Sequence, residues 1–94
     1  KLHLLYVLRG TPLADIYLRG EYEPMSADAY TDVVCSQLEL IPPDTVIARI
    51  TGDGMADDLL APEWSRKKLV VMNSIDREMY KRNSWQGKHF APLF

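Results

Sequence analysis

Hydrophobic residues open the chain as a nearly continuous run and then recur at helical spacing. The run Leu2–Leu8 has the length of a strand, and continuous apolarity is typical of a strand that is buried on both faces. Thr11 is a good N-cap before Pro12, and the two residues begin a helix predicted over residues 12–19, which Gly20 ends. The pattern therefore begins as a strand followed by a helix.

A second helix and a second strand follow. Ser26 is the N-cap of a helix predicted over residues 27–41, which Pro42 and Pro43 end. The β-branched segment 45–51 predicts a strand. More than 30 residues separate the two strands, which is the length of a crossover and not of a hairpin. The two strands are therefore expected to run parallel.

The last third of the chain predicts one long helix. After a loop over residues 55–60, this helix begins at Pro62 or Ser65 and runs to about Arg82. Its predicted inner face consists of Leu69, Met72, Ile75 and Met79. Residues 83–94 are interpreted as an irregular tail. The predicted fold is α/β, a single segment over residues 1–94 in the order β-α-α-β-α, whose open strand edges are expected to pair with another segment or a second copy.

Composition narrows the class of protein. Ninety-four residues, 47% hydrophobic and 26% charged, fit a small globular domain or a piece of a larger one and exclude a disordered chain. The chain starts at Lys1 directly before an apolar strand, which favours a fragment. The apolar runs are far shorter than the roughly 18 residues of a transmembrane helix, so no membrane span is expected. The chain has a single cysteine, Cys35, which favours a location in the cytoplasm. We expect its thiol to be buried and inert, and we expect no metal site.

Polar residues follow both predicted strands. Ligands of a parallel α/β sheet bind at the carboxyl ends of its strands. The candidate substrate-side residues at these ends are Arg9, Thr11, Arg49, Thr51 and Asp53. In the alternative interpretation, Thr11 only caps a helix and Asp53 only belongs to a glycine-flanked turn.

Positive charge concentrates in the last third. Residues 1–61 hold 4 Lys/Arg against 10 Asp/Glu, a net of −6, whereas residues 62–94 hold 7 against 3, a net of +4. One interpretation is a surface for RNA or another anionic partner, with Tyr80 and Trp85 stacking on bases, and the other is a solvated helix face. The basic residues of this candidate surface are Arg66, Lys67, Lys68, Arg77, Lys81 and Arg82.

Several sequence blocks resemble the C-terminal part of radical S-adenosylmethionine (SAM) proteins. The blocks are Tyr6–Leu13, Gly20–Tyr22, Leu40–Pro43, Val46–Asp53, Leu60–Trp64 and Asn83–Lys88. They resemble in particular a group of uncharacterised bacterial Fe–S oxidoreductases that are often labelled as relatives of oxygen-independent coproporphyrinogen oxidase. The first half of the chain is also similar to the radical SAM part of the catalytic subunit of Elongator.

The resemblance implies that the chain closes a partial (β/α) barrel, with the five strand-end residues toward the substrate and the rest of the barrel as its partner. In such enzymes a reduced 4Fe–4S cluster cleaves SAM to a 5′-deoxyadenosyl radical that abstracts hydrogen from the substrate. The family's three cluster cysteines, spaced Cys-x3-Cys-x2-Cys or in a longer variant near the first barrel strand, have no counterpart here, and Cys35 does not match them. The chain itself is therefore expected to have no cofactor and no catalysis. The alternative function is an RNA- or protein-binding module that uses the basic last helix.

Overall fold

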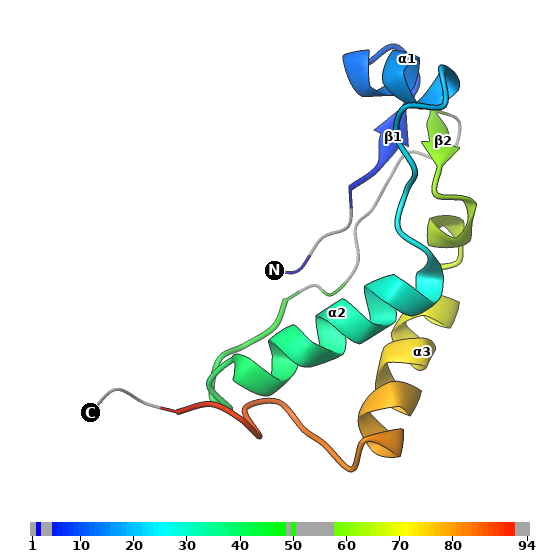
Figure 1. The fold of residues 1–94 in the computed structure, drawn as a ribbon. Coiled ribbons are helices and arrows are strands. Elements are labelled where there is room, and N and C mark those ends of the chain that lie inside the picture. Colours follow the sequence, from blue (N-terminus) through cyan, green and yellow to red (C-terminus); the bar gives the residue numbers. More distant parts are fainter. Residues whose placement is uncertain (1, 3–4, 49, 51–57, 92–94) are drawn as a thin grey trace.

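The computed structural model describes residues 2, 5–48, 50 and 58–91. In chain order, its elements are β1 (Val7–Leu8), α1 (Pro12–Leu18), α2 (Ala27–Leu40), β2 (Leu59–Ala61), the 3-10 helix η1 (Glu63–Arg66) and α3 (Lys68–Lys81). Figure 1 shows β1, β2 and α1 together at one end of the molecule and α2 beside α3 at the other. The predicted mixture of helices and strands is confirmed.

The first two helices begin where their N-caps predict. Thr11 Oγ1 accepts a hydrogen bond from the Ala14 N–H at 3.2 Å, and Ser26 Oγ accepts one from the Ala29 N–H at 3.1 Å. Both hydroxyls satisfy amide groups that have no partner inside their helix. Gly20, with a φ of 77°, follows α1 in the left-handed region that glycine adopts without strain.

The predicted last helix is divided in two. Lys67, with φ −102° and ψ 74°, interrupts the helical backbone between η1 and α3. Ser65 does not cap α3, because its hydroxyl donates to the Pro62 carbonyl at 2.6 Å. The predicted inner face is also partly wrong, since Leu69 is 72% exposed while Val71 and Ile75 are buried.

The sheet differs from the prediction of parallel strands. β1 pairs with β2 in an antiparallel arrangement, Val7 opposite Ala61 and Leu8 opposite Leu59, with an irregularity between the two pairs. The strand partner thus lies at 59–61, a region that the sequence analysis placed largely in a loop.

The segment 45–51 was predicted as the second strand, but its described residues 45–48 and 50 form no strand. The Thr45 N–H donates to the Pro42 carbonyl at 3.0 Å, and the Thr45 carbonyl accepts a bond from Gln86 Nε2 at 2.8 Å. The Val46 side chain is 87% exposed. β-Branched residues favour strands because they pack on a half-buried pleated surface, and no described strand provides that surface here.

Two apolar clusters hold the molecule together. The larger joins α2 to α3 through Tyr30, Val34, Cys35, Leu38, Val71 and Ile75, and the smaller joins the sheet to α1 through Val7, Ala14 and Ala61. The radius of gyration is 15.1 Å, compared with about 12 Å for a compact domain of this length. The molecule is therefore elongated.

The segment after α3 completes the C-terminal end of α2. Its described residues, 83–91, form turns without a helix or strand. The Gly87 N–H donates to the Leu38 carbonyl at 2.9 Å, and the His89 N–H donates to the Glu39 carbonyl at 2.8 Å. These carbonyls belong to the last turn of the helix, where few amide partners remain. The Leu38 carbonyl also accepts from the Ile41 N–H at 3.2 Å. Among the described residues, no helix is long and apolar enough to cross a membrane.

Candidate functional site

The predicted strand-end residues are only partly within the described residues. Arg9 follows β1, where its backbone N–H donates to the Asp58 carbonyl at 2.7 Å, and its side chain is exposed. The Thr11 hydroxyl accepts from Ala14 and donates to the Leu8 carbonyl at 2.7 Å, so it serves the start of α1. The other three predicted residues, Arg49, Thr51 and Asp53, lie outside the described residues.

The predicted basic residues do not lie on one face. Arg77 and Lys81 are four positions apart on α3 and share a face, whereas Lys68 precedes Arg77 by nine positions, two and a half turns, and so lies on the opposite side. Lys67 is exposed at the break before α3. Arg66 forms an ion pair with a residue of the same 3-10 helix: its Nε is 3.1 Å from a Glu63 carboxylate oxygen. The basic surface therefore has at least two separate parts.

Arg82 is the centre of an ion-pair network between α2 and α3. Its Nε is 2.7 Å from Glu78 Oε2, its Nη1 is 3.0 Å from Glu39 Oε1, and it also binds the Asp32 carboxylate. Hydrogen bonding to Glu78 raises the pKa of Arg82. A hydrogen bond from Ser84, at 2.5 Å, and the nearby Arg82 lower the pKa of Glu39. Arg82 therefore already binds three carboxylates of its own chain.

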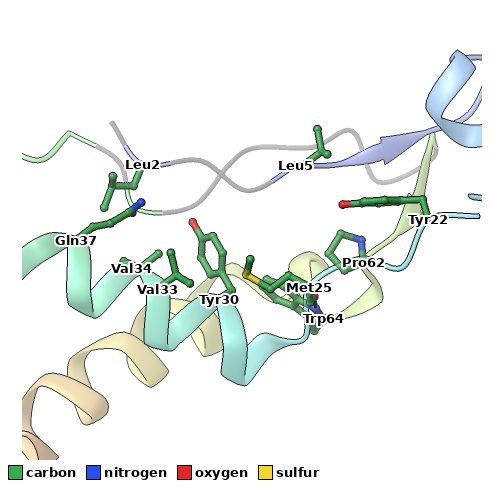
Figure 2. A pocket seen from close by; sticks show the side chains of 10 residues that line it. All are labelled: Leu2, Leu5, Tyr22, Met25, Tyr30, Val33, Val34, Gln37, Pro62 and Trp64. Carbon is green, nitrogen blue, oxygen red and sulfur yellow. Dashed lines mark hydrogen bonds between the residues drawn. The ribbon is translucent and has the colours of Figure 1, made fainter.

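An apolar groove with a volume of about 180 Å³ lies between α2 and the segment before β1. We call it the α2 groove; its lining residues are Leu2, Leu5, Tyr22, Met25, Tyr30, Val33, Val34, Gln37, Pro62 and Trp64. Figure 2 shows the Tyr30 side chain extending from α2 into the groove, with Trp64 near it.

Two aromatic rings define the base of the groove, and their polar atoms are already bonded. The ring centroids of Tyr30 and Trp64 are 5.4 Å apart at an angle of 40°. The Tyr30 hydroxyl donates to the Ile50 carbonyl at 2.7 Å, and Trp64 Nε1 donates to the Met25 carbonyl at 3.0 Å. Burial, with a smaller effect of Tyr6, raises the pKa of Tyr30, which keeps its hydroxyl protonated. The base of the groove therefore offers apolar contact and not acid–base chemistry.

The rim of the groove exposes large apolar side chains. Leu5 is 60% exposed, Met25 46% and Val33 40%. The sequence pattern does not predict this site. The one available signal was Trp64 in the block Leu60–Trp64, which contributed to the family resemblance but not to a site prediction.

The described residues do not fit an iron–sulfur cluster. They contain no group of three or more His, Cys, Asp or Glu side chains that could hold a metal ion. Cys35 is fully buried between α2 and α3, and its thiol donates to the Ile75 carbonyl at 3.6 Å. Burial raises the pKa of this thiol, which disfavours the thiolate that binds iron.

Comparison with known proteins places these features in a family. A family model described as the radical SAM C-terminal domain matches residues 1–81. The chain is 45% identical over 93 residues to the uncharacterized protein YtqA of Bacillus subtilis, covering 99% of the chain and 29% of YtqA. It is 33% identical over 91 residues to the uncharacterized protein MJ0486 of Methanocaldococcus jannaschii, covering 96% of the chain and 28% of MJ0486.

The third relative is a protein of the Elongator complex. The chain is 40% identical over 53 residues to Elongator complex protein 3 of Saccharomyces cerevisiae, covering 56% of the chain and 10% of that protein. The family and the likeness to Elongator that the sequence blocks predicted are both confirmed. The chain spans less than a third of the length of each of these three relatives.

Proposed function

Since the chain belongs to the radical SAM C-terminal domain family, we propose that it is the C-terminal part of a radical SAM iron–sulfur oxidoreductase. In this proposal it closes a partial (β/α) barrel and contributes to the substrate side of the active site. The observation that carries the proposal is the family match over residues 1–81 in a chain that covers 29% of YtqA.

The open edge of the sheet supports pairing with the rest of the protein. The antiparallel β1–β2 pair itself differs from the parallel strands of a (β/α) barrel, so it is the open edge that supports barrel closure. Among the described residues, β1 pairs with β2 along one edge only, so its other edge can accept a strand from the rest of the protein. An open strand edge is a surface that proteins usually cover or pair. A sheet of two very short strands is also unstable alone, which favours its incorporation in a larger sheet.

The cluster and SAM would be held outside this chain, because the environment of Cys35 does not fit a cluster ligand. The contribution of this chain would be to bind and orient the substrate. Arg9 is the described residue best placed for that contribution, since it is exposed directly after β1. Arg49, Thr51 and Asp53 remain proposed members of the same site. The proposal also includes that the full-length protein is related to oxygen-independent coproporphyrinogen oxidase and is located in the cytoplasm.

The test uses the full-length protein, purified and reconstituted under anaerobic conditions. Iron and sulfide content should match a 4Fe–4S cluster, and Cys35→Ser should leave that content unchanged. SAM cleavage should also survive Arg9→Ala, whereas conversion of the substrate should fall. A full-length protein that binds no cluster, or unchanged turnover in both Arg9→Ala and Asp53→Asn, would contradict the proposal.

The alternative function, an RNA-binding module, has one observation in its favour. Tyr80 is 88% exposed and Trp85 is 56% exposed, and Lys88 Nζ lies 5.2 Å from the centre of the Trp85 ring. Exposed aromatic rings beside basic side chains are typical of surfaces that bind single-stranded nucleic acid. Binding that weakens steeply with salt and is lost in Trp85→Ala would support this function.

A further inference from the structure

We propose that the α2 groove is the docking site for apolar side chains from the preceding part of the same full-length polypeptide. This inference rests on the proposed function, in which this chain is the C-terminal part of a longer protein. The occupant is thus a segment of the same molecule and not a second copy or a separate protein.

The first support is the apolar character of the groove rim. Leu5, Met25 and Val33 come from three different parts of the chain and expose 40–60% of their surface around one hollow. Scattered exposed hydrophobic residues are ordinary, but a set gathered around a groove marks an interaction site. The apolar base beneath them, with its bonded Tyr30 hydroxyl and Trp64 indole, leaves few polar groups to satisfy when the groove is covered.

The second support is the length of the relatives that lies outside the region matched by this chain. The chain covers 29% of YtqA and 28% of MJ0486, so most of the length of such a protein lies outside it. Among the described residues, Leu5 and Val33 on the lining of the groove are 60% and 40% exposed. A larger body packed there would bury apolar surface that is exposed in the described part of this chain.

The third support is the position of the groove relative to the chain. Leu2 and Leu5 form one wall of the groove, so residues that precede them in a longer protein would arrive beside it. A tethered segment has an effective concentration on the order of millimolar, which exceeds the concentration of a second copy in most solutions. The tether therefore favours an intramolecular occupant over a dimer.

The test measures thiol labelling at single cysteines in the full-length protein. Val33→Cys places a thiol at the groove rim, and Val70→Cys is the matched control on an exposed position of α3 outside the groove. The two valines are 40% and 57% exposed in this chain, so the chain by itself predicts similar labelling rates. Native Cys35 is buried and should react slowly. Labelled peptides are identified by mass spectrometry, and each rate is divided by the rate in denaturant.

Docking predicts that the cysteine at position 33 is labelled at least about tenfold more slowly than the one at position 70. Equal rates would overturn the proposal. Protection that disappears when the protein is diluted to a monomer would also overturn it, in favour of a second copy. Met25→Cys, at a rim position that is 46% exposed, repeats the test if the variant at position 33 does not fold.

The iron content of the same preparation separates the two proposals. Protection at position 33 in a protein without a cluster supports docking and contradicts the radical SAM function. Equal labelling in a protein with a cluster supports the function and overturns docking.

Discussion

The Gly87 N–H donates a hydrogen bond to the Leu38 carbonyl at 2.9 Å, and this contact brings the glycine against the loop that follows α2. Gly87 has a φ of 85°, and a Cβ atom added there would lie 2.5 Å from Pro43 Cγ. Both the backbone conformation and the space at this position therefore require glycine.

The first prediction concerns this glycine. Gly87→Ala should lower the free energy of unfolding by about 1–3 kcal/mol, because the methyl group forces the 84–90 segment away from Pro43. Gly20→Ala is the matched control: its φ is 77°, but an added Cβ meets nothing within 4 Å. Chemical denaturation of both variants gives the comparison. An equal loss of stability in the two would mean that the backbone conformation alone matters.

The second prediction concerns the Tyr30 hydroxyl. Tyr30→Phe should cost about 0.5–1.5 kcal/mol of stability, because it removes the 2.7 Å bond to the Ile50 carbonyl from a side chain that is 6% exposed. Tyr80→Phe makes the same chemical change at a side chain that is 88% exposed, and it should change stability by less than about 0.5 kcal/mol. Urea denaturation distinguishes the two. A neutral Tyr30→Phe would show that water replaces the lost donor.

The third prediction concerns the inner face of α3. Ile75 is 1% exposed and Leu69 is 72% exposed. Ile75→Ala should therefore cost about 2–5 kcal/mol by leaving a cavity between α2 and α3. Leu69→Ala should change stability by less than about 0.5 kcal/mol. Thermal or chemical unfolding measures both. A large loss in Leu69→Ala would restore the inner face predicted from the sequence or reveal a partner on that side.

The fourth prediction is a pH dependence. The pKa of Glu39 is lower in the folded protein than its ordinary value of 4.5, mainly because Ser84 donates to the carboxylate. A carboxylate with a lowered pKa stabilises the folded state above its ordinary pKa, and this contribution is lost as the pH falls through the folded-state pKa. Wild type should therefore exceed Glu39→Gln in stability at about pH 7, and the difference should shrink at about pH 3.

Denaturation at a series of pH values checks this dependence. Ser84→Ala removes the main cause of the lowered pKa, so in that background the pH dependence of the same difference should be smaller. A stability difference between wild type and Glu39→Gln that is constant with pH would contradict the assignment.

The helices could be predicted from the sequence because their signals are local. Thr11 and Ser26 cap helices with their own side chains, and Gly20 ends a helix by its own conformational freedom. The family could also be predicted, since its sequence blocks extend over most of the chain. The break at Lys67 could not be predicted because neither a proline nor a glycine stands at that position.

The sheet could not be predicted because pairing depends on distant residues. Val46 belongs to a segment with strand propensity, but propensity supplies no partner, and the side chain is 87% exposed. Leu59 and Ala61 form the strand opposite β1 although their segment is too short to carry a strand pattern. The α2 groove was missed for the same reason: Leu5, Met25 and Trp64 meet only in the folded molecule.

The bonds from Gly87 and His89 to Leu38 and Glu39 also bear on the order in which the protein is made. The Leu38 and Glu39 carbonyls are synthesised about fifty residues before the Gly87 and His89 amides that bond to them. During translation, this end of α2 therefore lacks these two partners until residues 87–89 have been synthesised. Contacts of such long sequence separation form late and slow the folding of small proteins. A nascent chain that stalls before residue 87 would thus carry an unfinished helix end.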